Sequence, residues 1–368
     1  DLDAAAAQVA QMALRDAVVL RACAEPDAVL AGVCDLAALD GQLDWIAALP
    51  LDAVIVSDIG LVTRLRSRLP GAELHLSTQA NCTNSEAARL YRDLGFTRIV
   101  PARELSLADI EEIKRAVPEL ELEVFVHGAM CLAYSGRCLL SAWFAGRSGN
   151  RGDCAHSCRW SYRVAVEEEQ RPGEYLPVEE GSGFTTILSP KDLCMIEHLG
   201  ELKNAGVDSV KIEGRVKSAY YAAVVTRAYR KELDRLDRGA DPSFSEPYIA
   251  DLWNVSHRDY STGFYFGDPD AVAPGSARYM QRYRFLGSVG DQLAENRFEI
   301  SVKNGFAVGD EIEYIGPDLP VAVDSNFVLR NPAGERVERL THHTGGSIET
   351  QIALEPGYLI RRRAPDQQ

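Results

Sequence analysis

The sequence predicts an α/β protein built as a TIM-like (β/α) barrel and followed by a small all-β domain. Short apolar segments alternate with longer amphipathic ones between residues 52 and 215, which is the pattern of a parallel sheet. No glycine-rich dinucleotide fingerprint follows any of these segments, so a barrel is favoured over a doubly wound sheet. After residue 276 the chain changes to short β segments separated by turn-forming residues.

The elements are expected in a regular order. The first 50 residues are rich in Ala and Leu and predict helices. Predicted strands follow at 52–58, 73–79, 97–105, 121–128 and 209–215. Predicted helices lie at 60–70, 84–95, 106–118 (capped by Ser106), 195–206 and 216–238. The opening residues are too few for three further βα units, so we expect a barrel that is incomplete at its N-terminus, or a chain that begins inside the domain.

Composition divides the chain into three parts. We predict a barrel-like catalytic domain over 1–240 with a cysteine-rich insertion at 129–194, a linker or extension over 241–275, and a small β-barrel or β-sandwich over 276–368. The 46% hydrophobic content is ordinary for a globular protein. No apolar run approaches the ~20 residues of a membrane span, and no basic leader opens the sequence. We therefore expect a cytoplasmic protein with reduced thiols.

Polar residues stand at the end of every predicted strand. In a barrel these ends line one mouth, where active sites form. One such residue is usually a helix cap or a turn former, but five strands in succession favour a functional mouth. The candidates are Gln79, Asn81, Glu104, His127, Glu213, Arg215 and Lys217.

Cysteines and arginines gather in one segment of a chain whose net charge is −15. This segment holds Cys131, Cys138, Cys154 and Cys158, and Asp153 is the only acid between Cys131 and Arg163. The chain offers one tight pair of the kind that zinc ribbons use, Cys154-x3-Cys158. An iron–sulfur cluster tolerates wider, irregular spacing. Buried, inert thiols are the third interpretation, and we prefer it for Cys23, Cys34 and Cys82.

The same segment resembles a known family. EVFVHGAMCLAYSGRCLLS looks like the signature of the peptidase U32 family. NRGDCAHSCRWSY, LSPKDLCMIEHL, GVDSVKIEGRVKSAYYAAVVTRAYR and VSHRDYSTGFYFG resemble that family in the same order. The resemblance runs from about Leu51 to Gly267, and the C-terminal β domain is similar to the domain that the family appends.

The resemblance implies a chemistry that the family label does not. Several members are oxygen-independent hydroxylases that act on tRNA wobble uridine, on a ribosomal RNA cytidine or on ubiquinone precursors, with a [4Fe–4S] cluster and with prephenate as the expected oxygen source. Carried over by motif, the cluster ligands are Cys131, Cys138, Cys154 and Cys194. Cys158 is then left outside the ligand set. We expect a tRNA hydroxylase that forms 5-hydroxyuridine; the alternatives are a U32-type peptidase or collagenase, and a hydroxylase of rRNA or a quinone precursor.

Roles follow for the remaining candidates. Arg215 and Lys217 suit the two carboxylates of prephenate, while His127, Glu213 and Glu104 are candidates for moving protons and Gln79 and Asn81 for binding substrate. Arg159 and Trp160 are an aromatic–basic pair suited to RNA bases, although a solvated surface explains such arginines equally well. Expected partners are tRNA or rRNA and a homo- or hetero-oligomeric subunit. A non-catalytic, cluster-bearing sensor is the third class of function; it would need no open mouth.

Overall fold

The computed structural model describes residues 43–44, 46–48, 51–131, 133–135, 137–147, 154–160, 165–167, 175–177, 191–214, 217–267 and 280–364. These residues divide into two units. The α/β unit comprises the described residues from 43 to 213 together with 258–267. The C-terminal unit comprises the described residues from 214 to 257 and from 280 to 364. Within the described residues no helix has the length and apolarity needed to cross a membrane.

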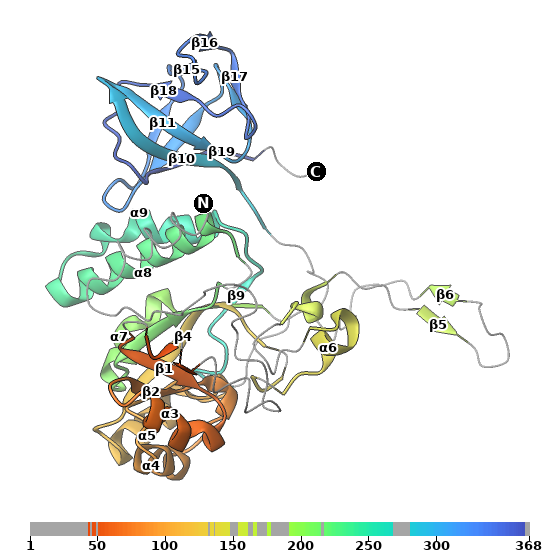
Figure 1. The fold of residues 1–368 in the computed structure, drawn as a ribbon, viewed down its shortest axis with the longest axis vertical. Coiled ribbons are helices and arrows are strands. Elements are labelled where there is room, and N and C mark those ends of the chain that lie inside the picture. The colour runs from red at the N-terminus through yellow and green to blue at the C-terminus, as the bar shows by residue number, and fades with distance from the viewer. Residues whose placement is uncertain are drawn as a thin grey trace. The chain divides into compact units, whose positions relative to one another are not determined.

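The α/β unit alternates strands and helices along the chain (Figure 1). Its elements are β1 (Ala53–Val56), η1 (Ile59–Leu61), α3 (Val62–Arg68), β2 (Glu73–Leu76), η2 (Thr78–Ala80), α4 (Ser85–Asp93), β3 (Arg98–Ile99), α5 (Leu107–Ala116), β4 (Glu121–Ala129), α6 (Leu140–Ala145), η4 (Ser157–Arg159), β5 (Ala165–Glu167), β6 (Tyr175–Pro177), β7 (Asp192–Cys194), η5 (Ile196–His198), α7 (Leu199–Asn204), β8 (Ser209–Ile212) and β9 (Tyr260–Ser261). Each predicted strand and helix between 52 and 215 therefore has a counterpart.

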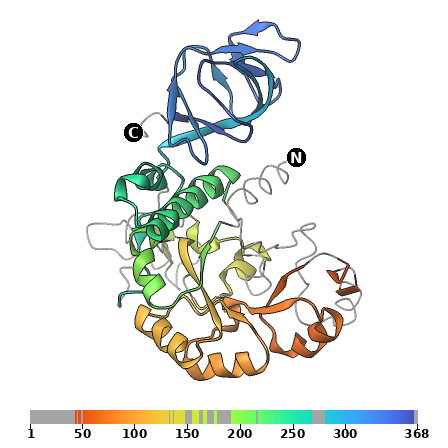
Figure 2. The ribbon, with the colours of Figure 1, turned by 90° about the vertical axis from the view of Figure 1, so that its left-hand side faces the viewer.

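Five strands lie parallel and side by side in chain order, β1–β2–β3–β4–β8. Figure 2 shows the helices on one side of these strands. The all-parallel barrel is not confirmed, because β7 joins β4 in the antiparallel sense and β9 then pairs with β7. The described strands β1–β4 and β7–β9 thus form one mixed sheet of seven. Strand β7 is the last part of the predicted cysteine-rich insertion and pairs with the end of β4.

Local signals explain why the elements form where they do. Ser106 caps α5 with a reciprocal hydrogen-bonding box, in which its hydroxyl and the Asp109 carboxylate each accept a backbone N–H. Among these strands β4 lies deepest, with all but its first residue buried. Leu76, Ile99 and Leu122 on neighbouring strands are completely buried and form the centre of this core.

The C-terminal unit joins helices to an antiparallel β domain. Its elements are α8 (Ala219–Arg238), η6 (Pro242–Phe244), α9 (Glu246–Ile249), η7 (Ala250–Trp253), β10 (Tyr283–Ala294), β11 (Arg297–Val302), β12 (Phe306–Ala307), β13 (Ile312–Ile315), β14 (Ala322–Asp324), β15 (Val328–Arg330), β16 (Arg336–Val337), β17 (Arg339–Leu340), β18 (Ser347–Glu349) and β19 (Leu359–Arg363). Eight of these strands form one sheet in the order β14–β13–β19–β10–β11–β18–β15–β16, with all pairings antiparallel. The predicted all-β domain is confirmed.

Helix α8 belongs to this second unit, which differs from the predicted boundary at 240. Buried Arg227 on α8 forms an ion pair with Asp251 and donates a hydrogen bond to the Gly316 carbonyl oxygen over 2.9 Å. Arg361 on β19 also pairs with Asp251, over 2.8 Å. These buried charges tie the helix to the β domain, so the helix is part of the same compact unit.

Candidate active site at the strand ends

The carboxyl ends of β4 and β8 are held together at the centre of the site. The Glu213 backbone N–H donates a hydrogen bond to the His127 carbonyl oxygen over 2.8 Å. Gly128, which directly follows His127, has a φ of 102°, and a Cβ atom on it would lie 2.1 Å from the Glu213 carbonyl oxygen. Glycine is therefore required for the two strand ends to approach. The backbones of His127 and Glu213 are therefore held next to each other.

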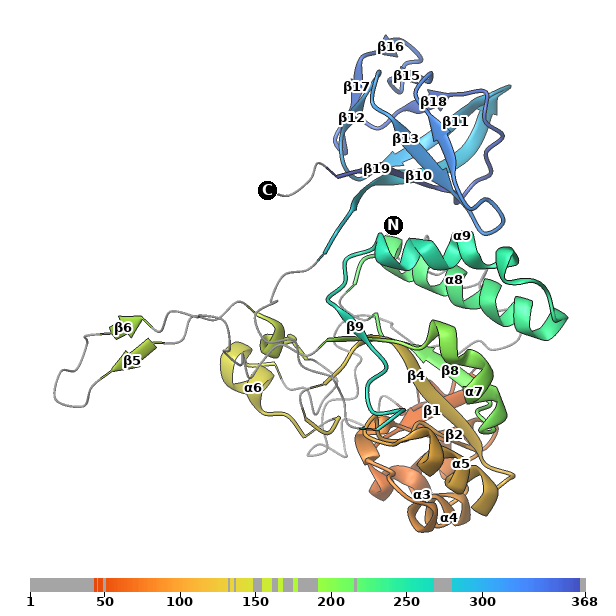
Figure 3. The same ribbon diagram turned by 180° about the vertical axis from the view of Figure 1, so that it is seen from behind.

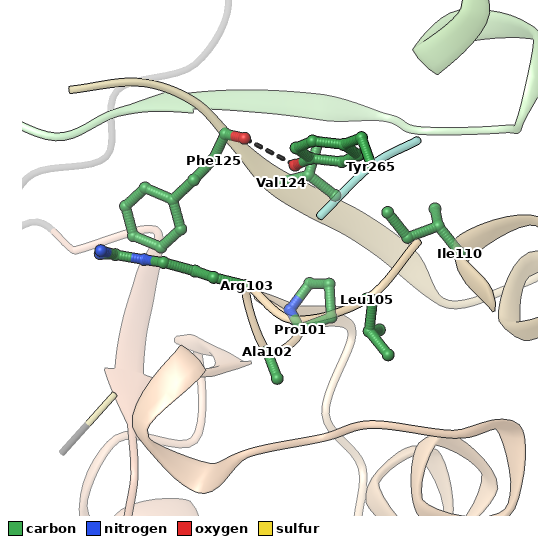
Figure 4. Close-up of a pocket in the computed structure, with 8 residues that line it drawn as sticks. All are labelled: Pro101, Ala102, Arg103, Leu105, Ile110, Val124, Phe125 and Tyr265. Atoms are coloured by element: carbon green, nitrogen blue, oxygen red, sulfur yellow. Dashed lines mark hydrogen bonds between the residues drawn. The ribbon is translucent and has the colours of Figure 1, made fainter. Parts of the chain in front are cut away.

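Arg103, at the end of β3, connects this pair to the first cysteine. Its Nη1 atom donates hydrogen bonds to the Ala129 carbonyl oxygen (2.9 Å) and to Cys131 Sγ (3.2 Å), and Nη2 lies 4.0 Å from Glu213 Oε2. The guanidinium lies 3.8 Å from the centre of the Phe125 ring. Figure 4 shows these two side chains beside each other. Arg103 is not among the site residues predicted from the sequence. The structure places it in contact with a cysteine sulfur.

Two tyrosines complete this side of the site. The Tyr260 hydroxyl lies 3.4 Å from His127 Nε2, and the Tyr265 hydroxyl donates to the Phe125 carbonyl oxygen over 2.6 Å (Figure 4). Both tyrosines come from the segment predicted as a linker or extension, whereas the structure assigns 258–267 to the α/β unit. The cavity between Arg103, Phe125 and Tyr265 measures about 10 Å³, which is too small for a nucleobase.

Glu104 follows Arg103, and its surroundings change the pKa of its carboxyl group. Burial raises its pKa, and backbone N–H groups of Glu104 and Arg103 offset part of this rise. Its Oε2 atom is buried and accepts no hydrogen bond from the described residues. A half-buried carboxyl group with a raised pKa is suited to hold and release a proton.

Gln79 and Asn81 lie on the turn after β2, beside the turn after β3. The Ala102 N–H donates to the Cys82 carbonyl oxygen over 3.0 Å, which joins the two turns. Asn81 has a left-handed backbone with a φ of 56°, and its amide donates to the Gln79 carbonyl oxygen over 2.9 Å. The buried Asn81 Oδ1 atom accepts no hydrogen bond from the described residues. Strained polar residues of this kind concentrate at functional sites.

The cysteines of the insertion lie within electrostatic reach of one another. Burial raises the pKa of Cys158 to about 11, and the charges of Cys131, Cys154 and Cys138 raise it further, while Arg159 opposes them. Cys131, Cys138, Cys154 and Cys158 therefore form one cluster, called the thiol group below. Cys131 is exposed, and the other three are partly buried. Cys82 is fully buried and separate, in keeping with an inert thiol. Cys23 and Cys34 lie outside the described residues.

Cys194 lies beside His127. The two residues are directly opposite each other on the antiparallel pair formed by β4 and β7. Opposite residues of such a pair have neighbouring side chains on the same face of the sheet. The fourth ligand implied by the family motif is therefore next to a candidate catalytic histidine.

Arg159 holds the cysteine segments together from inside the protein. Its Nη1 atom lies 2.5 Å from Asp192 Oδ1, and its Nη2 atom donates to the Met130 carbonyl oxygen over 3.2 Å. Met130 precedes Cys131, and Asp192 precedes Cys194 by two residues. This placement corrects the predicted role of Arg159 as an RNA contact, because a residue that is only 7% exposed and pairs with a buried carboxylate serves the interior. Its neighbour Trp160 is exposed.

The remaining predicted residues lie elsewhere. Lys217 is in the C-terminal unit, where its Nζ atom donates to the Ser256 carbonyl oxygen over 2.8 Å and lies 4.9 Å from the centre of the Tyr221 ring. Arg215 lies outside the described residues. The proposed pairing of Arg215 and Lys217 with two carboxylates stays a prediction.

The donor chemistry of the thiol group fits an iron–sulfur cluster. No three His, Cys, Asp or Glu side chains in the described part of the chain are placed to hold a single metal ion. A four-iron cluster takes one thiolate at each iron, so its ligands span a wider space than those of one ion. The sulfur atoms already accept hydrogen bonds, from Arg103 to Cys131 and from the His156 N–H to Cys154 over 3.3 Å. Such bonds are typical of cluster thiolates.

Comparison with known proteins places the chain in a family. A family model described as peptidase family U32 matches residues 29–273, and one described as the peptidase family U32 C-terminal domain matches 281–361. The chain is 37% identical over 329 residues to "tRNA hydroxylation protein P" of Escherichia coli, covering 78% of this chain and 71% of that protein. It is 35% identical over 278 residues to "23S rRNA 5-hydroxycytidine C2501 synthase" of Escherichia coli, covering 72% and 39%.

A third relative has a different kind of name. The chain is 29% identical over 346 residues to "Collagenase" of Porphyromonas gingivalis, covering 89% of this chain and 80% of that protein. The resemblance predicted from the motifs is confirmed, since one model spans more than half of the sequence and a second matches the β domain. The chain belongs to peptidase family U32.

Proposed function

We propose that this protein is an iron–sulfur-dependent, oxygen-independent hydroxylase of RNA. Its substrate is the wobble uridine of tRNA, its product 5-hydroxyuridine, and its oxygen donor prephenate. The observation that carries this proposal is the thiol group. Its Cys131 accepts a hydrogen bond from Arg103, and the described residues from 131 to 160 include no carboxylate. The similarity to a protein named for tRNA hydroxylation supports the choice of RNA over a peptide.

The thiols have a defined role in this proposal. Cys131, Cys138, Cys154 and Cys194 hold the cluster, with Cys158 close enough to three of them to be an alternative ligand. When bound, the cluster supplies either electrons or a Lewis-acidic iron. Arg103 orients Cys131, and Arg159 fixes the distance between the segments that carry Cys158 and Cys194.

Proton movement falls to the residues at the strand ends. His127 Nε2 faces the Tyr260 hydroxyl, so the pair can pass a proton between ring and phenol. Glu104, whose pKa is raised by burial, can take a proton that leaves the base. Gln79 and Asn81 offer amide groups for the base edge.

The first experiment identifies the reaction. The protein is purified without oxygen, and iron and sulfide are measured per chain together with the visible spectrum. It is then incubated with unmodified tRNA and prephenate, and the nucleosides are analysed by mass spectrometry. We expect about four irons per chain and a gain of one oxygen atom on uridine. Iron-free protein that still modifies tRNA would contradict the cluster, and cleavage of gelatin without change in tRNA would favour a peptidase.

The second experiment assigns the ligands. Single Cys→Ser variants are made at the five thiols of the site and compared for iron content. We expect large losses at Cys131, Cys138, Cys154 and Cys194 and retention at Cys158. The buried Cys82→Ser variant is the matched control, because its thiol lies outside the group. Loss of iron at Cys158 with retention at Cys194 would exchange these two residues in the ligand set.

A further inference from the structure

Large aromatic side chains are exposed beside the thiol group. Trp143 on α6 is 83% exposed, and Leu139, four residues earlier on the same face of the helix, is 72% exposed. Phe144 and Trp160 are 47% and 44% exposed. Side chains of this size are normally buried in a folded protein, so their exposure on one short helix and on the neighbouring Trp160 calls for a partner.

These aromatics are fixed relative to the cysteines. Helix α6, labelled in Figure 3, begins at Leu140, two residues after Cys138. Its buried Ser141 accepts a hydrogen bond from the Ala155 N–H over 2.8 Å, next to Cys154. The Phe144 and Trp160 ring centres are 6.5 Å apart, and Trp160 directly follows the turn that carries Cys158. The aromatic side chains therefore lie close in sequence to Cys138 and Cys158, on α6 and directly after η4.

The charge of this surface indicates what covers it. The described residues from 131 to 160 include two arginines besides the buried Arg159, which pairs with Asp192, and no carboxylate, although the whole chain has a net charge of −15. Arg137 and Arg147 are exposed. Exposed aromatics beside exposed arginines match a polyanion that presents flat π-faces, which is single-stranded nucleic acid. A second copy of this acidic chain would match the aromatic surface but not the arginines.

We propose that Trp143, Phe144 and Trp160 form a platform on which unpaired RNA bases next to the target nucleotide stack. This inference rests on the proposed function, because it concerns the same substrate at the same site. The platform binds loop nucleotides by their faces and therefore favours single-stranded loops over duplex, without reading their sequence. It places the flanking bases beside the cysteines, so that the target base is presented to the strand ends.

The test compares Trp143→Ala with the wild-type protein. Binding is measured by fluorescence anisotropy with a labelled tRNA anticodon stem-loop and with a fully paired duplex of the same length. We expect wild type to prefer the stem-loop, Trp143→Ala to bind it on the order of tenfold more weakly, and Trp143→Phe to recover most of the affinity. The KM for tRNA should rise more than kcat falls. Leu90→Ala is the control, since Leu90 is 56% exposed on α4 of the same unit.

Two results would overturn the platform. Equal stem-loop affinity of Trp143→Ala and wild type, at equal iron content, would show that bases do not stack there. Loss of self-association in Trp143→Ala, measured by sedimentation, with unchanged RNA affinity would make the surface an interface between copies. Failure of the proposed function looks different, because wild type itself would then neither bind nor modify the stem-loop, and that result removes both proposals.

Discussion

Arg159 and Asp192 form an ion pair in which Nη1 and Oδ1 are 2.5 Å apart, and their side chains are only 3% and 1% exposed. The pair joins the turn that carries Cys158 to the strand that carries Cys194. Asp192 is further fixed by the Arg258 N–H, which donates to its other oxygen over 3.1 Å. Loss of either partner leaves a buried charge without compensation, which is costly in a protein interior.

Asp192→Asn is expected to lower the free energy of unfolding by about 3 kcal/mol, because Arg159 remains buried without its counter-charge. It is also expected to lower the iron content. Urea denaturation and iron analysis measure the two effects. Glu111→Gln is the control, since its ion pair with Arg115 is exposed and spans 3.7 Å, and it should change stability by less than about 0.5 kcal/mol. Equal effects of the two substitutions would contradict the role of the buried pair.

Arg103→Gln is expected to lower activity roughly tenfold, because the hydrogen bond to the Cys131 sulfur and the contact with Glu213 are both lost. Since hydrogen bonds to sulfur favour the reduced cluster, the reduction potential should also become more negative. A redox titration followed by electron paramagnetic resonance measures this shift. Arg89→Gln on the exposed face of α4 should change neither quantity. An unchanged potential in Arg103→Gln would show that the sulfur contact is incidental.

Glu104→Gln is expected to separate stability from activity. The folded protein favours protonated Glu104, so the carboxylate opposes folding at neutral pH, and this penalty grows as pH rises above the usual carboxyl range. The amide removes the charge, and stability at pH 7 should rise by roughly 1 kcal/mol. Activity should fall about a hundredfold if Glu104 moves a proton. A stabilised variant with full activity would assign the residue a packing role only.

His75 is expected to make the α/β unit sensitive to acid. Burial lowers the pKa of His75, and its contact with Glu73 opposes this only in part. The unfolded chain therefore takes up a proton more readily than the folded one, so stability is lost as pH falls below about 6.5. The free energy of unfolding should fall more steeply between pH 7 and pH 5 for wild type than for His75→Gln. Parallel curves would show that other groups govern the acid response.

The local pattern of the sequence is enough to place the parallel strands and their helices. Alternation of apolar and amphipathic segments locates β1, β2, β4 and β8, and the Ser106 signal locates the start of α5. The sequence misses β7 and β9, which have three and two residues and form only through pairing with distant partners. No local period marks so short a strand. A series of parallel strands predicts a barrel, but the antiparallel strand β7 makes the observed sheet mixed.

The site is predictable where chemistry and strand position coincide. His127, Glu213 and the thiols follow from strand ends and motif, whereas the interior role of Arg159 does not, because its partner Asp192 is 33 residues away. An arginine beside a tryptophan has the same sequence appearance whether it faces solvent or a buried carboxylate. Tyr260 was missed for the same reason, since 133 residues separate it from His127.

The path of the chain between the two units sets a time order on the assembly of the site. The chain leaves the α/β unit after Glu213, builds α8 and α9 for the C-terminal unit, and returns at Arg258 to add β9. During synthesis from the N-terminus, the thiol segments and His127 are therefore exposed before Tyr260 and Arg258 exist to fix them. For the cluster proposed above, a nascent chain would offer an unfinished site, and insertion after release from the ribosome is the expected order.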